Sequence, residues 1–146
     1  MAAPTIFGSD AYSSSEIAAR IESVGVARAH MALVPTIMLG IVAGGFIGLG
    51  AMYYVIVASD AAMGFAAQGV LGGVVFSLGL VLVVIAGAEL FTGNNLLVMA
   101  WADRKITSAE LLRNWVIVYA ANAAGAVGLA IVVYLANHGA MNGGAV

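Results

Sequence analysis

The sequence has no cysteine and very little charge. Five Lys or Arg and seven Asp or Glu residues make only 8% of its 146 residues charged, whereas a soluble domain carries about 25%. The missing cysteine excludes a disulfide framework and thiolate chemistry, and the net charge of −2 argues against a nucleic-acid partner. His30 and His138 are far apart in the sequence and have no ligand-like neighbours, so we expect no metal site and no cofactor.

Long hydrophobic runs take the place of charge. Hydrophobic residues make up 63% of the chain. Residues 31–59 contain no Asp, Glu, Lys or Arg, and this uncharged run is long enough for one tilted membrane span. A second uncharged run covers residues 71–88. A third helix is expected from Ser108 to about Asn137, opened by a capping box at Thr107-x-x-Glu110. We therefore predict an all-α membrane protein with three spans in a lipid bilayer.

The segment before the first span predicts a surface helix. Ser13-x-x-Glu16 fits a capping box, and apolar residues then recur on one stripe, which favours an amphipathic helix at the membrane surface. A solvated leader with weak helicity is the alternative. We divide the chain into a cytoplasmic tail and amphipathic helix, residues 1–28, and a transmembrane domain, residues 29–146. The stripe consists of Ile17, Ile21 and Val24.

Small residues on the first span predict close helix packing. Gly40, Gly44 and Gly48 repeat every four residues on one helix face, which lets another helix approach closely. The third helix carries a small-residue face of its own, formed by Ala121, Gly125 and Gly128. We expect these faces to serve packing and assign them no chemical role.

A polar stretch at residues 87–95 interrupts the second hydrophobic run. One straight helix over residues 61–102 would be roughly 60 Å long, twice the hydrocarbon thickness of about 30 Å. The run must therefore break, and a break at membrane depth is tolerated only inside protein or beside a water-filled cavity. Such breaks point to transport sites. We expect Gly93 to adopt a positive φ and a half-helix to start near Asn95, capped by Asn94 or Asn95.

The basic residues indicate an orientation. All five lie in two segments that three spans would place on the same side, one before the first span and one between the second and third. The positive-inside rule puts the N-terminus in the cytoplasm, the C-terminus outside and the protein in the cytoplasmic (inner) membrane. The five residues are Arg20, Arg28, Arg104, Lys105 and Arg113.

The break itself resembles a known signature. Gly87-Ala88-Glu89-Leu90-Phe91-Thr92-Gly93 is similar to the signature of the formate/nitrite transporter family. The resemblance continues through Ile106-Thr107 and through Asn114-Trp115-x-x-Val118-Tyr119-x-x-Asn122-x-x-Gly125-Ala126, and it covers most of the chain from about Arg28 onward. Two segments at this spacing in so apolar a chain make the resemblance specific.

The resemblance implies an aquaporin-like fold of six spans in two inverted halves and homopentamers with one pore in each protomer. It implies a transporter or channel for formate, nitrite, hydrosulfide and related small anions, and no enzyme. Phe76 and Leu80 would line the outer constriction, and Leu90 and Phe91 the cytoplasmic one. Thr92 would face the permeating anion, and the amphipathic helix would take part in gating. We also count Asn94 and Asn95, beside Thr92, among the pore and substrate-binding residues.

Other roles remain open for these residues. Thr92 could cap the half-helix, Phe76 and Leu80 could be packing residues, and Leu90 and Phe91 could face lipid. We rank Glu89 as structural, held by hydrogen-bond donors of a neighbouring protomer, and expect Asn122 to join helices.

The chain carries three spans, about half the family length, without the second broken helix. A second-half chain is therefore an expected partner, and a pore formed by this chain alone is not expected. The alternative function is a non-transporting three-span membrane subunit or a truncated, inactive half.

Overall fold

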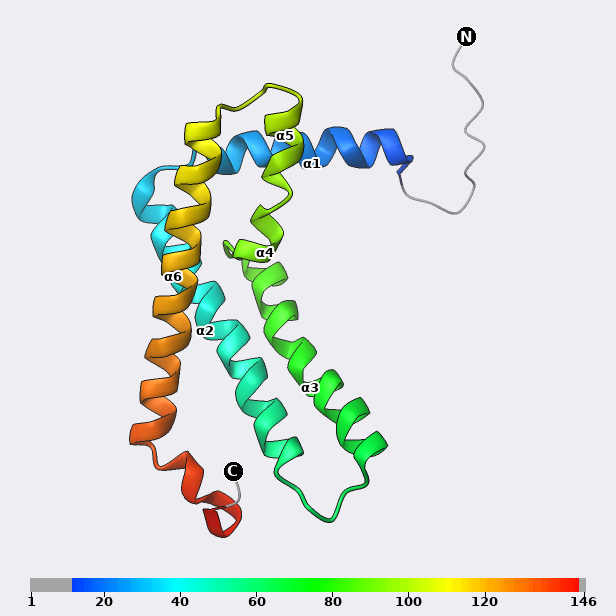
Figure 1. Ribbon diagram of the computed structural model, residues 1–146, viewed down its shortest axis with the longest axis vertical. Coiled ribbons are helices and arrows are strands. Elements are labelled where there is room, and N and C mark those ends of the chain that lie inside the picture. The colour runs from blue at the N-terminus through cyan, green and yellow to red at the C-terminus, as the bar shows by residue number, and fades with distance from the viewer. Residues whose placement is uncertain (1–11, 145–146) are drawn as a thin grey trace.

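A computed structural model describes residues 12–144, so most of the expected N-terminal tail lies outside the described residues. Over this range the chain forms six α-helices and a terminal 3₁₀ helix, η1, and no strand (Figure 1). The helices are α1 Ser14–Ala29, α2 Leu33–Ala58, α3 Phe65–Ala86, α4 Phe91–Asn94, α5 Leu97–Ala102 and α6 Ser108–Leu135, followed by η1 His138–Gly144.

Three of these helices, α2, α3 and α6, are long and apolar enough to cross a membrane. They contain 26, 22 and 28 residues, and even the shortest is roughly 33 Å long at 1.5 Å per residue, enough for a hydrocarbon core of about 30 Å. The prediction of an all-α membrane protein is confirmed, and the limits of the first and third spans differ from the expected ones by only a few residues.

The small residues of α2 and α6 serve close packing, as predicted, and the structure shows that the two helices pack against each other; Gly128 is the exception, since a Cβ there would have no atom within 4 Å. A Cβ atom on Gly44 would overlap the backbone carbonyl of Asn122, and one on Gly125 would overlap that of Ile41. Backbone therefore lies against backbone at this crossing, which only glycine permits. In lipid, where no hydrophobic effect drives helices together, such close packing is a main source of helix association.

Helix α1 lies across one end of the molecule, beside α5 and the N-terminal end of α6 (Figure 1). Both predicted capping boxes are present, Ser13 with Glu16 on α1 and Thr107 with Glu110 on α6. The C-terminal part of α1 is fixed, because buried Gly25 and Ala29 pack against α5 and the residues around it.

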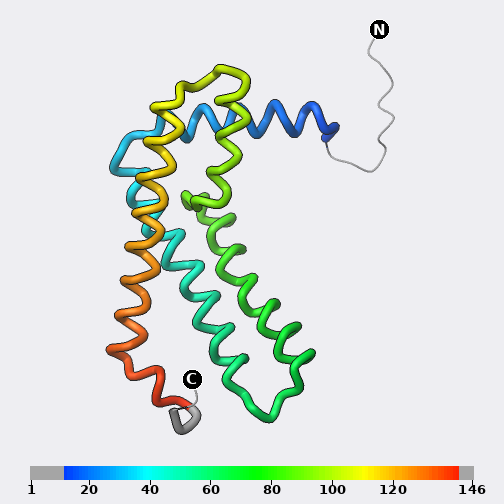
Figure 2. The backbone as a smooth tube through the Cα atoms, in the orientation of Figure 1, coloured from blue at the N-terminus to red at the C-terminus, as the bar shows by residue number. Residues whose placement is uncertain are grey.

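The second hydrophobic run is broken, as the sequence predicts. Figure 2 shows α3, α4 and α5 following one another along the molecule with an interruption between α3 and α5. The segment after the break differs from the single half-helix expected near Asn95: it begins at Phe91 and consists of two short helices, α4 and α5. The chain leaves helical geometry between Gly87 and Leu90, and these four residues position the candidate site.

Candidate functional site

Gly87 ends α3. Its φ of 61° and ψ of 31° place it in the left-handed region, where it serves as the C-cap residue of α3. The N–H groups of Gly87 and Ala88 donate to the carbonyls of Val84 and Val83, the arrangement by which a glycine closes a helix. The expectation of a positive φ at Gly93 is wrong, since Gly87 is the glycine that carries it among the described residues.

The expected amide caps are also wrong. Leu90 is the N-cap residue of α4 and Leu96 that of α5, and neither helix has a side-chain cap hydrogen bond. Asn95 is the C-cap of α4 and is exposed, while Asn94 is fully buried. Their proposed contact with an anion stays a prediction, which the burial of the Asn94 side chain disfavours.

Glu89 is the buried charge of the break, with 1% of its surface exposed. Its Oε1 lies 3.2 Å from Nε of Arg28 at the end of α1, and its Oε2 accepts a hydrogen bond of 2.7 Å from Nδ2 of Asn94. A carboxylate at this depth is costly unless it is paired and hydrogen-bonded. Its partners belong to its own chain, so the expected donors from a neighbouring protomer are not needed.

Asn94 joins this pair to α6. Its Nδ2 also donates to Oδ1 of Asn114 at 2.9 Å, its Oδ1 accepts from Nη1 of Arg28 at 2.6 Å, and its backbone carbonyl accepts from Nε1 of Trp115 at 3.0 Å. Asn114 in turn donates to the Arg28 carbonyl at 3.3 Å. Arg28, Glu89, Asn94, Asn114 and Trp115 thus form one network, here called the polar hub, that links α1, the break and α6.

Asn122 holds the other side of the break. Its Oδ1 accepts from the backbone N–H of Phe91 at 2.9 Å, and its Nδ2 donates to the carbonyls of Glu89 at 2.8 Å and Gly40 at 2.9 Å. One amide therefore satisfies backbone groups that the missing helical turn leaves open, and it fastens α6 to the break and to α2. The expectation that Asn122 joins helices agrees with these contacts.

The predicted pore residues occupy different surroundings. Thr92 and Gly93 are exposed, and no hydrogen bond from their N–H groups is present within residues 12–144. Leu90 packs against the buried cluster of Ala43, Val83 and Ala88. Phe91 makes edge-on contacts with Trp115 and Tyr119, with ring centroids 6.4 and 5.4 Å apart.

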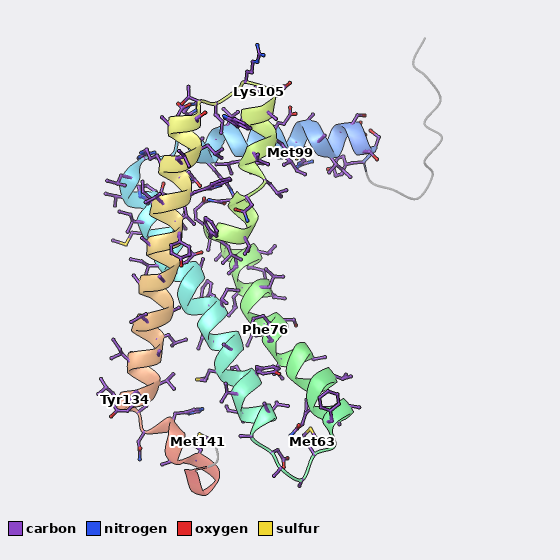
Figure 3. The ribbon with its side chains drawn as sticks, viewed as in Figure 1. Met63, Phe76, Met99, Lys105, Tyr134 and Met141 are labelled. Atoms are coloured by element: carbon purple, nitrogen blue, oxygen red, sulfur yellow. The ribbon has the colours of Figure 1, made fainter. Side chains whose placement is uncertain are left out.

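Phe76 and Leu80 lie on α3, with 39% and 51% of their surfaces exposed, and Figure 3 shows Phe76 on the middle of that helix, well away from the Lys105 end. The structure therefore brings Leu90, Phe91 and Thr92 together at the break, with Phe76 and Leu80 on the preceding helix. Their gating roles stay predictions.

Sequence reasoning missed Arg28, Asn114 and Trp115 as members of the site. A signal was available for Arg28, because a membrane-depth carboxylate needs a cation and Arg28 stands next to the first span. Asn114 and Trp115 lay within the motif of the resemblance, but nothing in their spacing alone points to Asn94.

The site combines a neutralised, buried network with an exposed polar tip. The Arg28 and Glu89 charges compensate each other, and a bound metal is not supported by any cluster of three potential ligands among the described residues. The exposed Thr92 hydroxyl and the free N–H groups beside it can donate hydrogen bonds. A fixed helix break at membrane depth with exposed donors defines a class: membrane proteins built around a discontinuous helix, as transporters are.

Comparison with known proteins agrees with this class. The model of the family described as formate/nitrite transporter matches residues 15–145. The protein belongs to the formate/nitrite transporter family, as the resemblance of its break predicted.

Similar proteins include formate channels. Formate channel FocA of Escherichia coli K12 is 37% identical over 115 residues, which cover 78% of this chain and 40% of FocA. Formate channel BtFdhC of Bacillus thuringiensis is 39% identical over 114 residues, 77% of this chain and 44% of the relative. The uncharacterized transporter YrhG of Bacillus subtilis is 38% identical over 125 residues, 84% and 46% of the two chains. The chain thus spans less than half the length of these relatives.

Proposed function

We propose that this protein provides one half of a transmembrane pore for small monovalent anions of the formate, nitrite and hydrosulfide class. The observation that carries the proposal is the break between α3 and α5, whose exposed Thr92 stands on a backbone fixed from behind by Asn122 and the polar hub. The names of two relatives, both formate channels, support formate as a substrate. Transport, and no covalent reaction, is the activity that this arrangement serves.

The physical role of the break is to offer hydrogen bonds in place of the water that hydrates the anion. A bare anion in hydrocarbon is very costly, so a pore must offer hydrogen-bond donors where the anion loses its hydration. In the proposed pore, Thr92 donates its hydroxyl hydrogen, and apolar side chains keep the path dry on both sides. These side chains are Leu90 and Phe91 toward α1 and Phe76 and Leu80 toward the other end.

The pore needs an inverted second half. Polar backbone at Thr92 and Gly93 is exposed, and unsatisfied polar groups facing lipid cost several kcal/mol each. A second copy of this chain would insert in the same orientation, because its basic residues lie at one end. We therefore propose a partner half of opposite orientation, continuous with this chain or separate from it, and a homopentamer of the completed units in the cytoplasmic membrane.

Flux measurements test the proposal. The 146-residue chain is placed in liposomes alone and together with the C-terminal half of a family member, and uptake of formate, nitrite and sulfate is followed. We expect no flux from the chain alone and flux of formate and nitrite, but not sulfate, from the pair. Selective formate flux by the chain alone would contradict the need for a second half. A stable pair that carries no anion would favour the alternative, a non-transporting three-span subunit.

The proposed orientation has its own test, helped by the absence of cysteine. A single cysteine replaces either Met63, between α2 and α3, or Lys105, between α5 and α6, which lie at opposite ends of the molecule in Figure 3. With the N-terminus in the cytoplasm, an impermeant reagent added to intact cells should label Met63→Cys only. Labelling of Lys105→Cys alone would show that the topology is the opposite of the proposed one.

A further inference from the structure

An apolar cavity of about 500 Å³ lies between α2 and α6. This volume is within the range of about 300 to 1,000 Å³ that is usual for small-molecule sites. Small residues, Gly48 and Ala51 of α2 and Ala126 and Ala130 of α6, line it beside larger apolar ones, and none of its lining residues belongs to α3, α4 or α5. The cavity is therefore formed away from the broken helix. We call it the α2–α6 groove.

One polar atom in the groove lacks a partner. His138, the first residue of η1, lines the groove, and its Nε2 is buried without a hydrogen-bond partner among the residues that the structure describes. Buried polar side-chain atoms are nearly always hydrogen-bonded. The occupant of the groove is therefore expected to be apolar along its length and to bring an oxygen to His138.

The position of the groove fits one leaflet of a bilayer. On α2 it runs from Gly48 to Val55, about 10 Å at 1.5 Å per residue, within half of a hydrocarbon core of about 30 Å. Tyr134, which also lines it, is 82% exposed and lies with Met141 at the end of the molecule opposite Lys105 (Figure 3). Tyrosine is enriched at membrane interfaces, so His138 stands where an acyl chain meets its ester group.

We propose that the α2–α6 groove binds one acyl chain of a bilayer phospholipid, with an ester or phosphate oxygen of that lipid hydrogen-bonded to Nε2 of His138. The order of polarity along the groove, apolar toward the membrane interior and polar at its end, is that of a lipid. A partner half that completes the pore would have to cover the exposed break, and the groove contains no residue of the break. The site is thus separate from the proposed transport path.

Lipid retention tests the site. The chain is extracted from vesicles of equal parts palmitoyl-oleoyl phosphatidylethanolamine and phosphatidylglycerol, and bound lipid is counted by native mass spectrometry. We expect one retained lipid per chain and at least a five-fold loss of retention in Ala130→Phe, which fills the groove. The control is Ala124→Phe, an exposed alanine of the same helix that lines a separate apolar cavity of about 370 Å³. It should retain lipid as the unaltered chain does.

The histidine has a test of its own. His138→Phe should weaken retention by about 2- to 10-fold, the equivalent of one hydrogen bond, and His138→Gln, which keeps a donor, should restore part of it. Circular dichroism checks the helix content of each variant. No retained lipid in the unaltered chain, unchanged retention in Ala130→Phe, or an equal loss in Ala124→Phe would overturn the proposal.

A cross-linker at the exposed edge of the groove distinguishes the possible occupants. Benzoylphenylalanine in place of the exposed Tyr134 should form an adduct of lipid mass in the vesicles. An adduct with a partner half or with a second copy of the chain, in place of lipid, would show that protein covers the groove and would reject the lipid.

Discussion

Helix α6 is joined to the rest of the chain in two different ways. Against α2 it packs mainly through small residues, so that backbone touches backbone at Gly44 and Gly125, and the Asn122 side chain adds one hydrogen bond to the Gly40 carbonyl. Against the break it extends Asn114, Trp115 and Asn122, whose side chains bind backbone and polar atoms directly. The backbone groups of two intact helices are paired within each helix, so a close fit is the main requirement. A broken helix has free groups, and side chains must supply the hydrogen bonds that the missing turn would have made.

The largest effect is expected where backbone meets backbone. In Gly125→Leu the new side chain would overlap the Ile41 carbonyl, and because neither helix can yield locally we expect a loss of about 3 kcal/mol or more, the upper range for overpacked sites. Unfolding of detergent-solubilised protein by added SDS measures it. Gly128→Leu is the matched control, since a Cβ at Gly128 has no atom within 4 Å. Equal destabilisation of both variants would contradict backbone packing as the cause.

Breaking the polar hub should have the next largest effect. Glu89→Ala leaves Arg28 and Asn94 without their partner, and removal of one member of a buried pair typically costs 3–5 kcal/mol. Because 27% of the Arg28 side chain is exposed, solvent screening reduces the expected loss to about 2–3 kcal/mol. The same SDS titration applies, with Glu22→Ala as the control. If the double variant Arg28→Ala/Glu89→Ala loses the full sum of the two single losses, the residues are not coupled.

Asn122→Leu tests both kinds of contact, backbone packing and side-chain hydrogen bonding, at a single residue. The backbone of Asn122 lies against Gly44, whereas its side chain makes three hydrogen bonds to Phe91, Glu89 and Gly40. We expect a loss of about 1–3 kcal/mol from buried groups left unpaired and faster amide exchange at Phe91. The α2–α6 contact should persist, as the distance between spin labels at Gly45 of α2 and Gly128 of α6 can show, since an added side chain meets no atom within 4 Å at either position. Exchange that is unchanged at Phe91 would mean that Asn122 does not hold the break.

The smallest effect is expected at Lys105, where α1 meets the loop before α6. Ion pairs with Glu22 and then with Asp103 raise the pKa of Lys105 above its ordinary value of 10.5. A raised pKa means that the stabilisation is fully present below pH 10.5 and is lost as the pH rises through the higher, folded-state value. Lys105→Met should therefore unfold at a slightly lower temperature than the unaltered chain at pH 7. At strongly alkaline pH the two unfolding temperatures should be the same. A difference that grows with alkalinity would contradict the ion pairs.

Local signals accounted for what the sequence could predict. The spans follow from hydropathy, both capping boxes from four-residue patterns, and the break from the length of the run and its polar cluster. The errors at Gly93 and at the amide caps came from placing the start of the half-helix near Asn95, whereas helix resumes at Phe91 and Gly93 and Asn94 lie within α4. Gly87 directly follows the last residue of α3, where a C-cap glycine is expected, and was the better choice for a positive φ.

The polar hub could not be predicted in the same way. Its hydrogen bonds join residues 66 positions apart, Arg28 to Asn94, and 86 apart, Asn114 to Arg28. No periodicity encodes such pairs, because they depend on how α1 and α6 are placed by packing elsewhere. What the sequence did contain was the requirement itself: a carboxylate in an apolar run must find donors.

The central claim is that the exposed side of the break handles the anion, and Thr92 tests it most directly. Formate uptake is measured in liposomes for the chain completed by its second half, with Thr92→Val, Thr92→Ser and Thr36→Val. Thr36 is a buried α2 threonine that donates to the Ala32 carbonyl. We expect flux to fall at least ten-fold in Thr92→Val, to persist in Thr92→Ser, and to be little changed in Thr36→Val. Full flux in Thr92→Val, from protein that is folded and correctly inserted, would contradict the claim.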